Sequence, residues 1–242
     1  MSNRKEIIAK NIAVMLHDGD FVNLGIGIPT LVSNYLPEGM QIILHGENGA
    51  AGISGKIPSD DIFSTPERFL SWEKAHKGDT TNHFAGHKDL VDPGGFPITL
   101  MRGGCVFDVT TSFAMSRGGH LDLAVLGAMQ VDQEGNLANW MVPGKMVTGM
   151  GGAMDIVTGT KKVIVATTIL ASDGAKKLMK KCNLPLTALH RISTVVTEKC
   201  IAEIADHHFM ITHVYPGVTK EEILSSIDGD VVFADKIGEM LI

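Results

Sequence analysis

The first candidate for chemistry is a glutamate beside a turn signal. Glu47 follows the apolar run 40–44 and precedes Asn48-Gly49, and Asn-Gly is the strongest short signal for a tight turn. Ligands of open α/β sheets bind beyond the carboxyl ends of strands. A carboxylate on this corner is therefore a candidate site residue. A solvent-exposed turn acid is the alternative, and the glycine-rich backbone around Glu47 favours the site.

Two further glycine-rich segments could present backbone N–H groups to a ligand. The segment Gly25-Ile26-Gly27-Ile28-Pro29 lies between a predicted strand and a predicted helix, where a glycine turn can bind an anion. It is not a dinucleotide fingerprint, because Thr30 stands where the third glycine belongs. Gly151 and Gly152 could line an oxyanion hole. A tight strand-to-helix turn and close helix–strand packing are the respective alternatives.

Two side-chain patterns are interpreted as structural. Methionines recur every four residues at Met146, Met150 and Met154, a spacing typical of core filling. The lysine-rich segment 176–181 is the longest basic cluster, and a solvated helix face explains it. A local anion-binding role is the alternative for the lysines.

His83 and His87 have the spacing at which two histidines on one helix could bind the same zinc ion, and His76 lies nearby in the sequence. Loop-forming residues surround this pair, and no third ligand has a conventional spacing. We therefore expect no metal site and interpret the segment as a solvated insertion.

The elements that must position these residues alternate between helix and strand. Apolar spacing predicts a helix over 3–16, and 30–36 also has a helical pattern. Thr219 to Glu222 form a capping-box motif that opens a helix. The predicted strands are 21–24, 40–44, 120–126, 163–166, 194–196 and 209–212. This order predicts one α/β domain over 1–242. The segment 52–106 has weak periodicity and reads as a long insertion with one helix around 66–76.

The composition excludes several classes of protein. The 242 residues carry a net charge of −6, which argues against general nucleic-acid binding because phosphate contacts dominate that affinity. Three cysteines are too few for a disulfide framework and indicate a reducing compartment. No signal peptide or 18-residue apolar stretch is found. We expect a cytoplasmic protein that does not contact a membrane. The 27 glycines exceed the roughly 17 that average usage predicts.

Several ordered motifs together resemble the β-subunits of family I 3-oxoacid CoA-transferases. They cover about 5–50 and 107–240, and the run Val22 to Thr30 and the Glu47-Asn48-Gly49 turn are among them. The others are Arg117 to Asp122, Val125 to Val131, Gly135 to Lys145 and Gly149 to Asp155. The resemblance implies the CoA-transferase-like α/β fold, an open and mostly parallel sheet flanked by helices.

The resemblance also implies a chemistry. Glu47 matches the family's nucleophile, which forms a glutamyl–CoA thioester in a ping-pong reaction. Coenzyme A would be a substrate, with no permanently bound cofactor or metal. Expected reactants are short-chain acyl-CoA and carboxylates such as acetoacetate, butyrate or acetate. The expected partner is a separate α-subunit in an α2β2 complex. The candidate residues for binding CoA and the oxyanion are Gly25, Ile26, Gly27, Ile28, Pro29, Asn48, Gly49, Asn139, Gly151 and Gly152.

The sequence departs from the family in two places. His45-Gly46 stand before Glu47, where the family usually has Gln-Ser, and the segment 52–106 is longer and more charged than the usual connector. Loops carry specificity, so the acyl substrate stays open. Two alternative functions also stay open: hydrolysis of acyl-CoA by water, and a non-enzymatic effector-binding module of related fold.

Overall fold

The structure is a computed structural model, and it describes residues 4–56, 62–63, 67, 71, 74, 77, 86–87 and 89–242. The chain forms two compact units. Unit 1 comprises Met1–Ile42 and Ala114–Ile242, and unit 2 comprises Ile43–Phe113. The single domain expected from the sequence stays a prediction, because compactness alone does not show whether either unit folds by itself.

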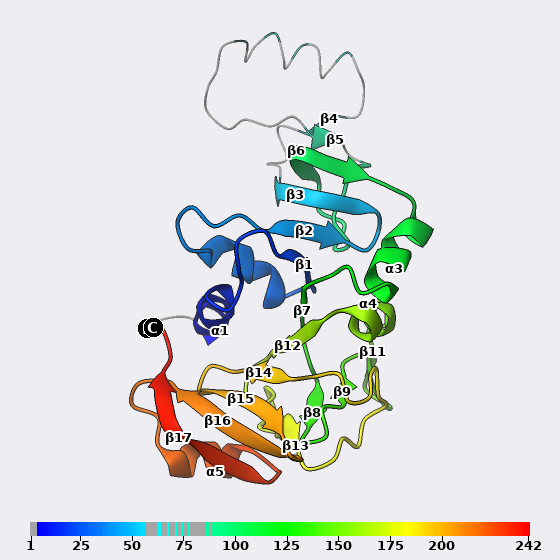
Figure 1. The fold of residues 1–242 in the computed structure, drawn as a ribbon. Helices are drawn as coiled ribbons and strands as arrows, with labels where there is room; N and C mark the ends of the chain where they lie inside the picture. The colour runs from blue at the N-terminus through cyan, green and yellow to red at the C-terminus, as the bar shows by residue number, and fades with distance from the viewer. Residues whose placement is uncertain are drawn as a thin grey trace. The chain divides into compact units, whose positions relative to one another are not determined.

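Unit 1 contains a mixed sheet that is mostly parallel (Figure 1). Its strands run in the order β17-β16-β15-β14-β12-β7-β1. The pairs β1–β7, β7–β12, β12–β14 and β16–β17 are parallel, and β14–β15 and β15–β16 are antiparallel. The bounds are β1 Phe21–Leu24, β7 Leu123–Leu126, β12 Lys162–Ala166, β14 Thr194–Val196, β15 Cys200–Ala205, β16 His208–Val214 and β17 Val231–Glu239. The predicted α/β class with a mostly parallel sheet is confirmed.

Two inner strands of unit 1, β7 and β14, are buried along their whole length. All four residues of β7 are buried, as are all three of β14, which is typical of parallel strands covered on both faces. The helical elements are α1 Arg4–Ala13, the 3₁₀ helix η1 Pro29–Tyr35, α4 Ala153–Gly159 and α5 Lys220–Ser226. Helix α1 packs against β12 and β14, and α4 packs against β7. Within the described ranges, no helix is long and apolar enough to cross a bilayer.

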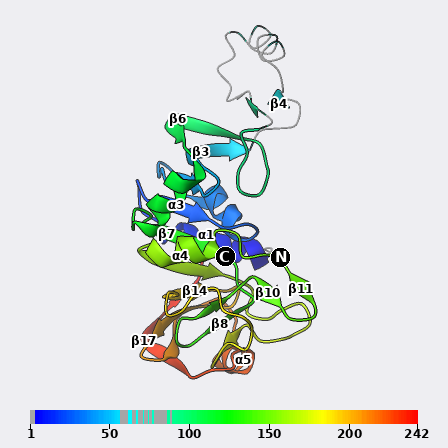
Figure 2. The ribbon, with the colours of Figure 1, turned by 90° about the vertical axis from the view of Figure 1, so that its right-hand side faces the viewer.

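Short strands in unit 1 correct two sequence interpretations. A three-stranded sheet has the order β13-β8-β9, and β10 and β11 form a separate hairpin (Figure 2). Their bounds are β8 Gln130–Asp132, β9 Leu137–Ala138, β10 Met141–Val142, β11 Met146–Val147 and β13 Leu178–Met179.

The methionines predicted to fill the core do not all do so. Met146 and Met154 are 47% and 43% exposed, so the prediction is wrong for these two residues. They lie in a strand and a helix and cannot share one helix face. The lysines at 176–181 flank strand β13, so the predicted helix face is also wrong.

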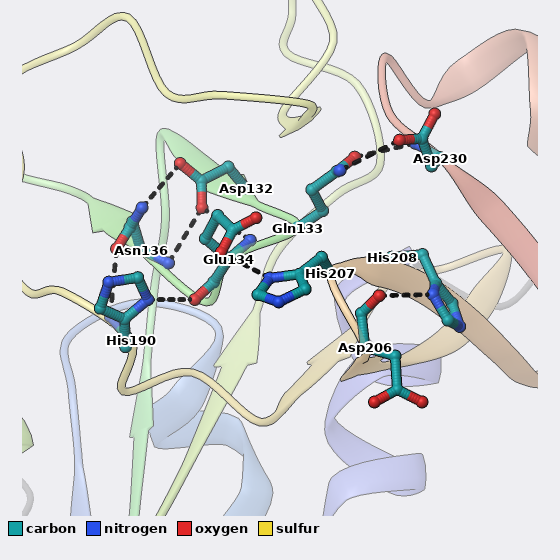
Figure 3. A network of polar contacts seen from close by, with 9 residues as sticks. All are labelled: Asp132, Gln133, Glu134, Asn136, His190, Asp206, His207, His208 and Asp230. Carbon is teal, nitrogen blue, oxygen red and sulfur yellow. Dashed lines mark hydrogen bonds and ion pairs between the residues drawn. The ribbon is translucent and has the colours of Figure 1, made fainter.

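A polar network organises the turn between β8 and β9 (Figure 3). Asp132 is 1% exposed, and its carboxylate accepts hydrogen bonds from the backbone and side chain of Asn136 at 3.0–3.1 Å. The Glu134 carboxylate lies 2.7 Å from His207 Nδ1, within hydrogen-bond distance. His207 and the preceding Asp206 both have positive φ, 63° and 48°, a conformation that L-residues rarely adopt. The contact joins the β8–β9 turn to the β15–β16 turn.

Unit 2 is built on an antiparallel sheet in the order β2-β3-β6. Its elements are β2 Ile43–Gly46, β3 Ala50–Lys56, β4 Ile62–Phe63, β5 Gly86–His87 and β6 Ile98–Val106, and α3, Val109–Arg117, begins in this unit. The strand predicted over 40–44 begins only at 43, because an apolar run does not fix where a ladder starts. The helix predicted around 66–76 and the histidines at 76 and 83 fall largely outside the described residues.

The capping box of α5 is confirmed, and it yields a stability prediction. Thr219 Oγ1 accepts from the Glu222 N–H at 3.2 Å, and the Glu222 carboxylate accepts from the Thr219 N–H at 3.3 Å. Thr219→Ala removes the hydroxyl that satisfies a free helix N–H, so unfolding should cost about 1 kcal/mol less. Urea denaturation measures the loss. Thr219→Ser keeps the cap and is the control, and equal stability of the two variants contradicts the assignment.

Candidate active site

Glu47 lies on a tight turn between β2 and β3. The Gly49 N–H donates to the Gly46 carbonyl at 3.0 Å, which closes the turn, and the Phe107 N–H donates to the Gly49 carbonyl at 3.0 Å. The side chain of Glu47 is half-buried. The predicted turn is therefore present, and the backbone on both sides of Glu47 is fixed by hydrogen bonds.

The glycines on either side of Glu47 leave no room for larger residues. Gly49 has φ +120°, and a Cβ there would overlap the Phe107 carbonyl oxygen. A Cβ at Gly46 would lie 2.9 Å from Asn48 Oδ1. Asn48 is exposed, and its Nδ2 donates to the Val91 carbonyl at 2.7 Å. Close packing of the Phe107 backbone thus explains Gly49, and side chains pack tightly against Gly46.

His45 lies two residues before Glu47 and is 3% exposed. Its Nε2 is 2.9 Å from the hydroxyl of Ser112, a buried residue of α3. The ring stacks on Phe107 with centroids 6.3 Å apart and an interplanar angle of 16°. Burial lowers the pKa of His45 to about 4, because desolvation disfavours the charged ring. His45 is therefore neutral at neutral pH.

This lowered pKa predicts a pH dependence of stability. Between about pH 6.5 and 4 the unfolded chain binds a proton at His45 and the folded chain does not. Stability is therefore complete above the unfolded pKa and falls as pH drops, by about 3 kcal/mol in total. Urea unfolding of the wild type and of His45→Gln, which cannot titrate, measures the difference. Parallel pH curves for the two proteins contradict the prediction.

The predicted site residues divide between the units. Glu47, Asn48 and Gly49 belong to unit 2, and the others belong to unit 1. Glu47, Asn48 and Gly49 lie in one turn, and the remaining candidates lie in unit 1.

The loop Gly25–Pro29 follows the carboxyl end of β1. The Gly25 N–H donates to the Val125 carbonyl at 2.8 Å, and a Cβ at Gly25 would lie 3.2 Å from both this oxygen and Leu126 Cδ2. Gly27 has φ +96° with open space around it, and its carbonyl accepts from the Thr30 hydroxyl at 2.8 Å. Ile26 is 70% exposed. Ile28 is the N-cap of η1, and Pro29 opens this helix.

Asn139 lies at the same end of the sheet as the Gly25–Pro29 loop, beyond the carboxyl ends of the strands. Its Nδ2 donates to the carbonyl of Gly127, which follows β7, at 3.2 Å. Its Oδ1 accepts from the Thr187 hydroxyl at 2.6 Å. Strands β1 and β7 are parallel with Leu24 opposite Val125, so their carboxyl ends lie at the same end of the sheet. The side-chain amide of Asn139 supports the loop after β7 through these bonds.

Gly151 and Gly152 lie at the start of α4. Gly151 is exposed with φ +53° and open space around it, and Gly152 is buried and forms the N-cap. The Gly152 carbonyl accepts from the Ile156 N–H at 3.0 Å. Gly151 thus has an accessible backbone, whereas Gly152 serves the first turn of the helix.

A contact of Lys177 that the sequence does not reveal lies just beyond the carboxyl end of β12. Lys177 Nζ donates to the hydroxyls of Thr167 and Thr168 at 3.0 and 3.3 Å. Burial lowers the pKa of Lys177, and the charge of Glu198 opposes this shift. Only the folded structure reveals this contact, since ten residues separate Lys177 from Thr167. No group of three metal-ligating side chains occurs within the described part of the chain.

Comparison with known proteins gives a family and relatives. The coenzyme A transferase family model matches residues 5–62 and 84–226, and so extends into the segment 52–106 and leaves 63–83 unmatched. The acetate CoA-transferase subunit beta of Haemophilus influenzae is 45% identical over 240 residues. That alignment covers 99% of this chain and 96% of the relative.

Solved structures share the fold at lower identity. An acyl-CoA transferase, YdiF, from Escherichia coli O157:H7 superposes with a TM-score of 0.70 at 20% identity, over 99% of this chain and 43% of that chain. This chain thus spans less than half of that structure's length. A variant of the decarboxylase AibA/AibB superposes with a TM-score of 0.66 at 13% identity, over 99% and 90%. Since one of these proteins is named a decarboxylase, the fold alone does not determine the reaction.

Proposed function

Because this chain belongs to the coenzyme A transferase family, we propose that it is the β-subunit of an enzyme that moves CoA between a short-chain acyl-CoA and a 3-oxo or other short carboxylic acid. The observation that carries the proposal is the Glu47 turn. Hydrogen bonds fix the backbone on both sides of a half-buried carboxylate, and this arrangement suits a nucleophile that must meet a thioester carbon in one orientation.

The proposed reaction keeps the energy of the thioester. A Glu47 carboxylate oxygen attacks the acyl carbonyl, the carbon–sulfur bond breaks, and a mixed anhydride and CoA thiolate form. The thiolate attacks the glutamyl carbonyl, the donor acid leaves, and a glutamyl–CoA thioester remains. An incoming carboxylate reverses both steps. No water is consumed and no net proton is transferred.

Each step passes through a tetrahedral oxyanion, which backbone N–H groups can stabilise. Removing one such donor typically costs ~3–4 kcal/mol of transition-state stabilisation. We assign this role and CoA binding to Asn48, the loop Gly25–Pro29 and the exposed backbone of Gly151. Gly152 and Asn139 support that backbone, because their polar groups are engaged within unit 1. Gly49 shapes the Glu47 turn, because its N–H donates to the Gly46 carbonyl. Coenzyme A is the substrate, and the site needs no resident cofactor.

The proposal includes a partner chain and a location. The relative from Haemophilus influenzae is named a subunit beta, which supports a separate α-subunit here. We propose that the two kinds of subunit assemble as α2β2. The absence of disulfide-rich composition supports the cytoplasm as its compartment.

The test is a mass measurement on the assembled complex. The chain is co-expressed with an α-subunit encoded by a neighbouring reading frame, and the purified complex is incubated with acetyl-, butyryl- or acetoacetyl-CoA. We expect a CoA adduct on the Glu47 peptide, which a short carboxylate discharges. Transfer activity with an unmodified Glu47 peptide overturns the mechanism.

Two alternative functions predict different outcomes of the same experiment. An acyl-CoA hydrolase releases free CoA in the absence of an acceptor acid, at a rate that added carboxylate does not increase. An effector-binding module binds a ligand without turnover, and its affinity for that ligand is the same in Glu47→Ala as in the wild type.

A panel of short carboxylates assayed with each acyl-CoA then identifies the substrate pair.

A further inference from the structure

His45 and Ser112 form a buried pair beside the Glu47 turn. His45 belongs to β2 and pairs with Ala51 of β3, so it lies in the hairpin that carries Glu47. Ser112 belongs to α3 and is fully buried. The 2.9 Å contact between His45 Nε2 and Ser112 Oγ therefore ties the hairpin to the helix.

The contacts of this pair reach both ends of the turn. Ser112 Oγ lies 3.5 Å from the Gly46 carbonyl, a long hydrogen bond to the residue before Glu47. The His45 ring stacks on Phe107, whose N–H donates to the Gly49 carbonyl at 3.0 Å. The buried imidazole of His45 thus contacts both Ser112, whose hydroxyl lies near the Gly46 carbonyl, and Phe107, whose N–H donates to the Gly49 carbonyl.

The neutral state of His45 suits a positioning role. A neutral imidazole carries one donor and one acceptor, and the Ser112 hydroxyl can satisfy either at Nε2. Burial keeps the ring uncharged at neutral pH, so the hydrogen bond to Ser112 remains its directional contact to α3.

We propose that His45 is a positioning residue that acts through Ser112 and Phe107 to hold the Gly46–Gly49 turn, and so sets the direction of the Glu47 carboxylate. This inference rests on the proposed function, in which Glu47 is the nucleophile. It assigns a role to a histidine that stands where the family usually has glutamine. Misplacing a reacting group by about 1 Å can cost roughly 10²-fold in rate.

The test compares three substitutions in the complex with the α-subunit. His45→Phe fills the ring's space and can stack on Phe107 but makes no hydrogen bond. Ser112→Ala removes the hydroxyl, and His45→Gln restores a side chain that can reach it. We expect kcat to fall about 10- to 100-fold in His45→Phe and Ser112→Ala, with KM for acyl-CoA within about twofold. We expect His45→Gln to stay within about threefold of the wild type.

A purely space-filling role for His45 predicts a different pattern. His45→Phe would then keep the wild-type kcat, and that result overturns the inference. The double variant His45→Phe/Ser112→Ala adds a second criterion, because partners in one contact are not additive. We expect its kcat to equal that of the lower single variant, and multiplied losses contradict the pairing. If His45→Phe does not fold, Ser112→Ala with wild-type kcat overturns the inference.

Formation of the Glu47 adduct separates this inference from the proposed function. Quenched samples analysed by mass spectrometry give the rate of adduct formation in each protein. If the wild type transfers CoA without an adduct, the proposed function fails. If the adduct forms in the wild type, and His45→Phe and Ser112→Ala form it at the wild-type rate, only the positioning role fails. We expect the adduct to form more slowly in these two variants and to reach the same final level.

Discussion

Replacing Glu47 with glutamine is expected to lower CoA transfer by about 10⁴-fold or more, the scale seen when a covalent nucleophile is removed. The amide has nearly the same shape as the carboxylate but lacks the anionic oxygen that attacks the thioester. The hairpin should therefore fold as before, since its backbone bonds run through Gly46, Gly49 and Phe107. Initial rates of transfer and the mass of the Glu47 peptide both measure the effect.

Two further variants calibrate this result. Glu38→Gln changes an exposed glutamate of unit 1 and should leave the rate unchanged. Glu47→Asp keeps the charge but withdraws it by one methylene, and roughly 10²-fold loss is expected because the oxygen no longer reaches the acyl carbon. Glu47→Gln with near wild-type transfer would remove Glu47 from the mechanism.

The second large effect is expected at Gly49. Its φ of +120° is costly for an L-residue, and an added Cβ overlaps the Phe107 carbonyl oxygen. Backbone cannot move aside as a flexible side chain can, so Gly49→Ala should lose about 3 kcal/mol or more of unfolding free energy. Urea denaturation followed by circular dichroism measures the loss.

The matched control for Gly49 is Gly19. Gly19 also has positive φ, +84°, but a Cβ there meets no atom within 4 Å. Gly19→Ala therefore isolates the conformational cost, about 1–2 kcal/mol, and should leave activity intact. Equal losses in the two variants would show that the overlap with Phe107 is relieved at no cost, and the turn would be softer than its contacts indicate.

Local sequence signals determined the elements whose formation depends on near neighbours. The capping box at Thr219, the Asn-Gly turn after Glu47 and the buried strands 163–166 and 194–196 were predictable because each depends on backbone propensity or apolar runs within a few residues. The ordered motifs were also long enough to place the chain in its family.

Tertiary structure decided which distant residues meet. Ser112 lies 67 residues from His45 and Lys177 ten residues from Thr167, and no local pattern encodes a pairing across strands and helices. The methionines and lysines whose spacing suits one helix lie in separate strands, turns and a helix, because long-range pairing overrides local periodicity. The sequence by itself determined that a glutamate stands on a glycine turn in a CoA-transferase chain. Only the fold decided that a buried, neutral histidine and a serine lie against that turn, since burial and long-range contact exist only after the chain has folded.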